Sequence, residues 1–228
     1  YSVGSRVLVM VDGMSILTPG TGEINWNMVP MENIDQVEVL KGASSVLYGS
    51  SALNGLIHVK TKRPGMEPAT SVSFRGGLYG KPRQAGTPMF GNLELSHSRR
   101  IGHLDLTVAA NGILDDSYRQ DNYNKRARAG MNLTYHDPRV YGLNYGANIN
   151  YLYNDYKGFF MWRSPEEYYV QSPLANMGRQ EHTFYIDPFL NFTNAEKQTT
   201  HRLKGRFFHR CSVLNKLTLL TYQYETKQ

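Results

Sequence analysis

A two-residue alternation of apolar and polar side chains runs through the chain from about residue 68 to its end. Residues 141–154 show it best, since Leu143, Tyr145, Ala147 and Ile149 alternate with asparagines and a glycine. A segment of this kind has one apolar and one polar face, which is the pattern of a β-strand between two different environments. Most of the chain is therefore predicted to form β-sheet.

Eight segments carry this alternation, and each is close to the roughly 9–11 residues that a tilted strand needs to cross a bilayer. They lie near residues 71–79, 89–99, 103–114, 126–136, 141–154, 183–193, 201–209 and 216–226. Mean hydropathy is −0.48, and no run of about 18 uncharged apolar residues occurs, which excludes a bundle of membrane-spanning helices. Strands of a membrane barrel are apolar on one face only, so this composition allows such a barrel.

The connections between these segments alternate between short and long. Residues 100–102, 136–139 and 194–198 are short, whereas 81–88, 115–124 and 154–182 are long. Outer-membrane barrels have tight periplasmic turns on one rim and longer extracellular loops on the other. A soluble β-sandwich, the alternative, has no reason to alternate its connections in this way. The joint over 210–215, which holds Cys211, is shorter than the barrel pattern expects.

Aromatic residues gather near the strand ends, where a barrel would carry interfacial girdles. The simpler explanation is that aromatic residues form strands well. The residues are Tyr118, Tyr123, Tyr135, Tyr141, Tyr153, Tyr156, Phe159, Phe160 and Trp162.

The N-terminal part is organised differently, and the composition changes near residues 62–65. Short strands are predicted over 7–11, 36–40 and 56–61, with one helical turn over 31–36 and a short helix over 43–48. Three motifs stand out in this part. They are Val7-Leu8-Val9-Met10-Val11-Asp12-Gly13, then Ile34-Asp35-Gln36-Val37-Glu38-Val39-Leu40-Lys41-Gly42, then Ser44-Ser45-Val46-Leu47-Tyr48-Gly49 with residues 50–62.

In this order and spacing, the three motifs strongly resemble the latter half of the plug domain of TonB-dependent outer-membrane receptors. Lys41 stands where that family usually has Arg, and Ala43 where it usually has Pro. The segment Ser98-Arg99-Arg100-Ile101-Gly102 is similar to receptors of this kind from Bacteroidetes.

The resemblance implies a β fold: a mixed α+β plug followed by antiparallel transmembrane strands of a 22-stranded barrel. Residues 1–65 are expected to be the C-terminal part of the plug, and residues 66–228 the first eight or so barrel strands. An eight-stranded barrel is filled by its own side chains and could not hold a plug. The chain is therefore expected to be a fragment, since the first plug half and the TonB box have no counterpart in it.

The resemblance also implies import of a scarce nutrient, such as a siderophore or other metal chelate, a glycan or a peptide, by energy-coupled movement of the plug. The implied partners are TonB with its inner-membrane proton-driven motor proteins, outer-membrane lipid and the nutrient, with a surface lipoprotein as a further candidate. A structural, adhesive or export-associated barrel without import is the alternative. The net charge of +6 comes from scattered Lys and Arg residues, so no nucleic-acid partner is expected.

Six residues are candidate ligand contacts, because the plug loop over 15–27 and the long loop over 154–182 would face the extracellular side. Their aromatic and amide groups suit a sugar or a chelate, although an ordinary turn is the simpler reading of each. They are Glu23, Asn25, Trp26, Asn27, Phe159 and Trp162.

Glu38 and Lys41 are candidate contacts between plug and barrel, with a solvated strand end as the alternative. Arg202, Lys204 and Arg206 alternate and so share one face, expected to be the lumen, where they would contact the plug, be hydrated or guide an anion.

No catalytic, metal or cofactor site is expected. The segment Gly49-Ser50-Ser51-Ala52-Leu53 lacks the second glycine of a nucleophile elbow. The seven histidines have no paired metal spacing. The protein is therefore predicted not to be an enzyme.

Overall fold

The computed structural model describes residues 7–18, 22–42, 48–80, 87–120, 122–172, 178–214 and 217–227. These residues form two sheets, one of four strands and one of eight. We call residues 7–64 the N-terminal unit and the eight-stranded sheet the wall. No helix within the described ranges has the length and hydropathy of a membrane span.

The N-terminal unit is built on a mixed sheet in the order β2-β1-β4-β3, in which β1 and β4 are parallel and the other pairs antiparallel. Its strands are β1 (Val7–Val11), β2 (Met14–Ser15), β3 (Ile34–Lys41) and β4 (Gly55–Thr61). Three single turns of 3-10 helix connect them: η1 (Trp26–Met28), η2 (Met31–Asn33) and η3 (Ser50–Ala52). The three predicted strands are confirmed.

Of the two predicted helical segments, one is shorter than expected and the other lies mostly outside the described residues. The turn expected over 31–36 ends at Asn33, because Ile34 pairs with Thr61 and so begins β3. The helix expected over 43–48 lies outside the described residues except for its last position, Tyr48.

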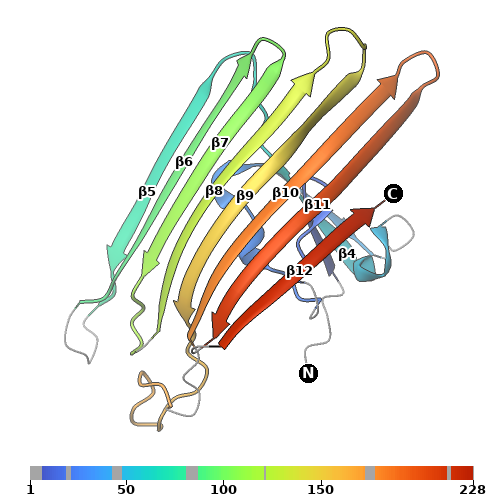
Figure 1. Cartoon of the computed structure of the whole chain (residues 1–228). Coiled ribbons are helices and arrows are strands. Elements are labelled where there is room, and N and C mark those ends of the chain that lie inside the picture. Colours follow the sequence, from blue (N-terminus) through green and yellow to red (C-terminus); the bar gives the residue numbers. More distant parts are fainter. Residues whose placement is uncertain are drawn as a thin grey trace.

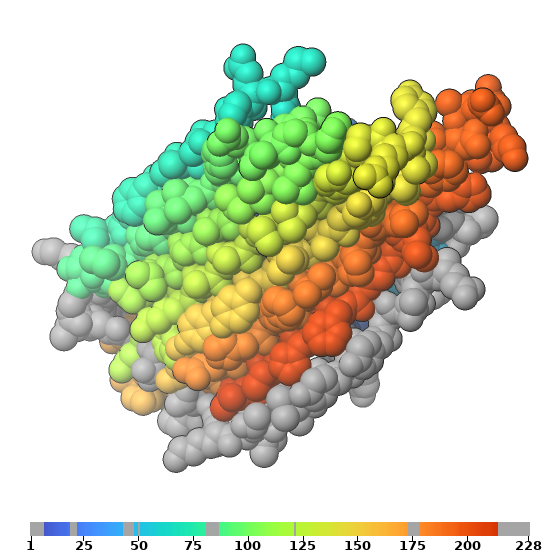
Figure 2. All heavy atoms as spheres, turned by 45° about the horizontal axis from the view of Figure 1, so that its top comes forward, coloured from blue at the N-terminus to red at the C-terminus, as the bar shows by residue number. Residues whose placement is uncertain are grey.

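The wall is a single antiparallel sheet in which every strand pairs with its neighbours in sequence, from β5 at one edge to β12 at the other (Figure 1). Its strands are β5 (Ala69–Leu78), β6 (Met89–Ile101), β7 (Leu104–Asp115), β8 (Tyr123–His136), β9 (Leu143–Lys157), β10 (Gly178–Asn194), β11 (Thr199–Leu214) and β12 (Leu217–Lys227). All eight predicted strands are therefore present, and the space-filling view shows β5 to β11 as slanted, adjoining rows (Figure 2).

Several strands are longer than the alternation predicted, because cross-strand pairing continues past the last clear alternating position. β9 runs to Lys157 and β10 begins at Gly178, which shortens the connection between them. β11 runs to Leu214, so the joint predicted over 210–215 is strand up to that residue. Cys211 lies within this strand and is paired with His182 of β10.

Exposure on the wall is the reverse of what a water-soluble sheet shows. Cross-strand partners such as Val72 and Leu95, or Phe74 and Leu93, lie on one face and are exposed. The opposite face buries polar side chains, including Ser96, Ser98, Asp105, Thr107, Asn111, Asn154, Glu181, Thr183 and Asp187. An apolar outer face and a polar inner face are typical of a sheet whose outer surface meets lipid.

Aromatic side chains gather at both ends of the wall. Tyr135 contacts the rings of His103 and Tyr145 at the short-turn end. Tyr79 contacts Phe90 and Tyr118 at the end that carries the long connections. These contacts agree with the interfacial girdles expected from the sequence.

The N-terminal unit lies against one face of the wall and behind it in the view of Figure 1. Its core packs directly on the wall, because Tyr185 of β10 and Phe208 of β11 belong to the same buried cluster as residues of the unit. Those residues are Val9, Val11, Ile16, Met28, Val29 and Val59. β4 ends at Thr61 and β5 begins at Ala69, so the expected division between residues 65 and 66 falls in the segment that joins the two sheets.

Gly55 begins β4 in a conformation that only glycine adopts easily. Its φ is +146°, and a Cβ at this position would lie 2.5 Å from the carbonyl oxygen of Leu40 on β3. We expect Gly55→Ala to destabilise the N-terminal unit by about 1–3 kcal/mol or more, from backbone strain and the clash. Hydrogen exchange of β3 and β4 amides in the full receptor measures this. Gly65→Ala is the matched control, since a Cβ there meets nothing within 4 Å, and equal exchange in the two variants would contradict the prediction.

Candidate functional site

The loop residues predicted to touch ligand have different roles in the structure. Asn25 caps η1, because its side-chain oxygen accepts a hydrogen bond from the Asn27 amide at 3.2 Å. The Asn27 side chain accepts from the Arg126 guanidinium of β8 at 2.8 Å. Trp26 is 59% exposed, and Glu23 is also exposed. Two of the four candidates therefore position the loop, whereas Trp26 and Glu23 lie exposed at the surface.

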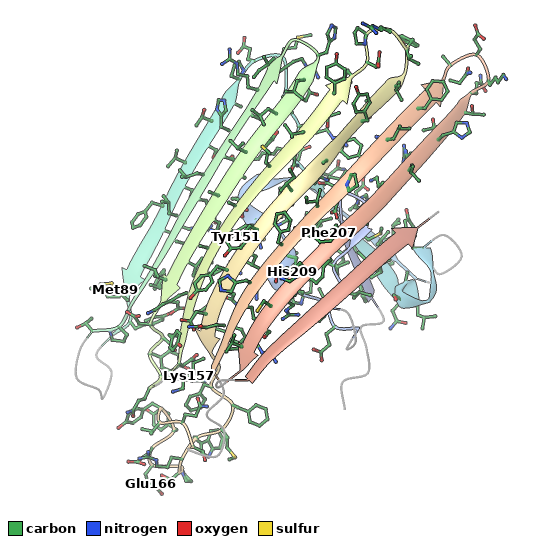
Figure 3. All side chains as sticks on the ribbon, in the orientation of Figure 1. Met89, Tyr151, Lys157, Glu166, Phe207 and His209 are labelled. Carbon is green, nitrogen blue, oxygen red and sulfur yellow. The ribbon has the colours of Figure 1, made fainter. Side chains whose placement is uncertain are left out.

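The two wall candidates, Phe159 and Trp162, lie in the connection between β9 and β10. The Arg119 guanidinium lies over the Phe159 ring, 4.6 Å from its centroid. Trp162 is 58% exposed and forms a backbone bridge with Gln171. Figure 3 shows how far this connection extends beyond the wall, from Lys157 at the end of β9 to Glu166.

The connections before β8 and before β10 contact each other. The backbone amide of Gln120 donates to the carbonyl oxygen of Tyr169 at 2.8 Å, and Arg119 also lies 5.2 Å from the Tyr118 ring centroid. Arg126, which donates to Asn27, lies near this end of its strand. The structure therefore places Trp26, Phe159 and Trp162 toward the same end of the wall, although none of the described contacts joins Trp26 to the other two.

Glu38 and Lys41 lie on β3, the edge strand of the N-terminal sheet. Glu38 is bound within that sheet, since its carboxylate accepts from the Lys60 ammonium at 2.5 Å and lies 3.7 Å from the His58 ring. The hydrogen bond from Lys60 lowers the pKa of Glu38, and partial burial lowers the pKa of His58. Lys41 is exposed. Contacts of these two residues with barrel strands stay a prediction.

The wall holds the N-terminal unit through two arginines of β8 that the sequence did not single out. Arg128 and Glu32 are both buried, 4% and 1% exposed, and their charged groups lie 3.6 Å apart. The Arg128 guanidinium also donates to the carbonyl oxygen of Val29. Arg126 and Arg128 alternate along a strand, and this is the same signal that identified Arg202, Lys204 and Arg206.

The alternating cations of β11 face the N-terminal unit. Contact with the plug was one of the alternatives predicted for them. The Lys204 ammonium donates to the carbonyl oxygen of Asp12, and the Arg206 guanidinium donates to that of Ser15. Arg206 also forms two hydrogen bonds to Asp187 of β10, both 2.6 Å, and lies 4.9 Å from the Tyr185 ring centroid.

Two uncharged residues of the wall complete the interface. The Asn132 amide donates to the Thr61 hydroxyl at 2.7 Å, and the Thr107 hydroxyl donates to the carbonyl oxygen of Lys62 at 3.4 Å. Strands β7, β8 and β11 therefore each supply polar groups to the N-terminal unit. The interface combines a small apolar core with individual hydrogen bonds and buried charges.

Known proteins resemble parts of this chain in sequence. The family model described as TonB-dependent Receptor Plug Domain matches residues 2–56. The Vitamin B12 transporter BtuB of Vibrio cholerae is 31% identical over 127 residues, which make up 56% of this chain and 19% of that protein. BtuB of Photobacterium profundum is 30% identical over 75 residues, which make up 33% of this chain and 12% of that protein.

Solved receptor structures share the fold across nearly the whole chain. The siderophore receptor PirA from Pseudomonas aeruginosa has a TM-score of 0.67 at 16% identity, covering 94% of this chain and 34% of that one. The ferripyoverdine receptor of the same organism has a TM-score of 0.66 at 17% identity, covering 92% of this chain and 29% of that one. The chain thus corresponds to only part of each relative.

Proposed function

Because the chain belongs to the TonB-dependent outer-membrane receptors, we propose that it forms the junction of plug and barrel wall in a receptor that imports a scarce nutrient by energy-coupled plug movement. Residues 1–65 would be plug and residues 66–228 wall. No chemistry on the nutrient is proposed.

The polar interface between the N-terminal unit and the wall is the observation that carries this proposal. Arg126, Arg128, Asn132, Lys204 and Arg206 each donate a hydrogen bond across it. A hydrogen bond from a charged group contributes about 1.5–3 kcal/mol net, and a neutral one such as that of Asn132 about 0.5–1.5 kcal/mol, because water can replace either partner. An interface built from such bonds can be exchanged for water step by step as the plug moves, whereas a wholly apolar interface would have to expose its area to water.

We propose that the nutrient binds at the end of the wall that carries the long connections. The exposed rings of Trp26 and Trp162, with Phe159 and Glu23, would contact it there, and Asn25 and Asn27 would hold the loop that carries Trp26. Their exposed aromatic surface is suited to stacking on a flat or cyclic ligand.

The named relatives favour a metal chelate or a corrinoid as the nutrient, since two are vitamin B12 transporters, one is a siderophore receptor and one is a ferripyoverdine receptor. A glycan or a peptide is the alternative nutrient class. The implied energy source is TonB with its inner-membrane motor proteins, because the outer membrane itself holds no such source.

Uptake by cells that produce the full receptor tests this function. Radiolabelled cobalamin, ferric chelates and oligosaccharides would be supplied to otherwise identical cells with and without TonB. We expect at least one of these nutrients to accumulate only when both the receptor and TonB are present. Cell attachment that depends on the receptor but not on TonB, with no TonB-dependent uptake, would instead favour a structural or adhesive barrel.

A further inference from the structure

A cavity of about 580 Å³ lies between the N-terminal unit and the inner face of the wall. β7, β8, β9, β10 and β11 all contribute to it, together with β4 and the segment that follows β4. The strands β7, β9 and β11 each follow a short turn, and the second residue of each lines the cavity. These residues are Asp105, Asn144 and Thr200. The cavity therefore reaches toward the short-turn end of the wall, away from the residues proposed to bind the nutrient.

Five lysine and arginine side chains line this cavity, and four of them, from both sides of the interface, form no ion pair among the described residues. Lys62 and Arg63 belong to the segment that leaves the N-terminal unit, whereas Arg202 and Lys204 belong to β11 of the wall. Among the residues that the structure describes, no carboxylate lies within 4.0 Å of any of these four cationic groups. The charge of Lys204 is attracted by Asp12 and, to a smaller extent, repelled by Arg202 and Arg63.

Most acidic groups of the lining are already bound to other residues. Asp105 is held by Arg100 and His136, and Asp187 by Arg206. Asp12 accepts two hydrogen bonds from Thr61.

The remaining charges of the lining do not cancel. Lys60 is paired with Glu38. Four unpaired cations thus face two carboxylates without a cationic partner, Asp12 and Asp35. The lining therefore carries a net positive charge, with Lys62 and Lys204 half-buried and Arg63 and Arg202 exposed.

We propose that this cavity binds a small anion that carries at least two negatively charged oxygen groups, either phosphate or carboxylate. The anion would bridge Arg63 on the side of the N-terminal unit and Arg202 on the side of the wall. The volume is within the range of small-molecule sites, about 300–1,000 Å³, so it accommodates more than a single water-sized ion. The asparagine and threonine side chains of the lining, including Asn132, Asn148 and Asn191, would donate further hydrogen bonds.

Such an anion could be a solute of the periplasm or a group on the nutrient as it leaves the barrel. Both present the same oxygen chemistry to Arg63 and Arg202. The binding proposed here does not depend on import, so a receptor that fails the uptake experiment can still bind the anion.

Isothermal titration calorimetry on the purified full receptor, with pyrophosphate and citrate as separate probes, tests the site directly. We expect saturable binding of at least one probe, weakened by added salt because the attraction is electrostatic. Binding without any added nutrient would assign the site to a periplasmic solute. Binding of a probe only when it is attached to an imported ligand would assign the site to the nutrient. No saturable binding in either form would overturn the proposal.

Arg63→Gln and Arg202→Gln locate the binding. Neither side chain makes a hydrogen bond or ion pair among the described residues, so both variants are expected to fold, and circular dichroism together with mobility of the folded barrel in gels checks this. Each is expected to weaken probe binding about tenfold, the effect of losing one charge-assisted contact. Arg139→Gln is the matched control, since Arg139 is an exposed cation in the turn after β8 and does not line the cavity. Equal loss in the control, or unchanged binding in both test variants, would contradict the site.

Discussion

Arg128→Met is expected to loosen the N-terminal unit on the wall by about 3–5 kcal/mol, the usual cost of removing one partner of a buried ion pair. Neither oxygen of the Glu32 carboxylate has a hydrogen-bond partner among the described residues, so it depends on the charge of Arg128 at 3.6 Å. The substitution also removes the hydrogen bond to the Val29 carbonyl. Arg126, the other nearby cation, is engaged with Asn27.

Native-state hydrogen exchange on the full receptor measures this loosening. Amides of η2 and of Val29 should exchange about 100-fold faster or more, since each 1.4 kcal/mol is about a factor of ten. Adding Glu32→Gln to the variant should recover much of the protection, because no buried charge is then left unpaired. Arg139→Met, an exposed position, is the control. If the exchange rates of these amides in Arg128→Met stay within about twofold of those in the wild-type receptor, the pair does not hold the unit. A twofold change corresponds to far less free energy than the expected ~3 kcal/mol.

Arg206→Met is expected to reduce stability by a similar amount. The loss affects the wall as well as the interface with the N-terminal unit. The ladder between β10 and β11 is interrupted between Ile186 and Phe189, where Pro188 has no amide hydrogen to donate. Arg206 and Asp187 lie at this interruption and bind each other through two hydrogen bonds. Without Arg206, the buried carboxylate of Asp187 loses its partner at the point where the ladder is interrupted, at a cost of about 3–5 kcal/mol.

This loss of stability is measured by the temperature above which the receptor no longer migrates in gels as a compact folded barrel. Arg206→Met should lower that temperature clearly, and the Arg206→Met, Asp187→Asn double variant should lower it less. If Arg206→Met migrates and unfolds at the same temperature as the wild-type receptor, the interruption of the ladder at Pro188 does not need the pair of Arg206 and Asp187.

The wall could be predicted from the sequence because its signal is local. A period of two needs only neighbouring residues to be recognised, and every predicted strand is present. The strand ends were less well predicted, since pairing with a neighbouring strand, as between Lys157 and Gly178, extended strands beyond the pattern. Alternation also placed Lys204 and Arg206 on the face that meets the N-terminal unit.

The partners across the interface could not be predicted in the same way. Arg128 and Glu32 are 96 positions apart, and no pattern within either segment shows that they meet. Glu38 was predicted to contact the barrel, and that contact stays a prediction. The partner that the structure shows is Lys60 of the neighbouring strand β4. Asn25 and Asn27 were predicted as ligand groups from residue type, and ligand contact stays a prediction. In the structure Asn25 caps η1 and Asn27 accepts a hydrogen bond from an arginine. Residue type identifies what a side chain can bind, but the fold decides which partner is within reach.

Four wall side chains donate to main-chain carbonyl groups of the N-terminal unit: Thr107, Arg128, Lys204 and Arg206. Every residue has such a carbonyl, so this recognition survives a change of side chain at the accepting position. Natural variation at those positions should therefore be wide as long as the backbone path is kept. A chimaera that joins this wall to the corresponding unit of a distant receptor should assemble more readily than its sequence divergence suggests.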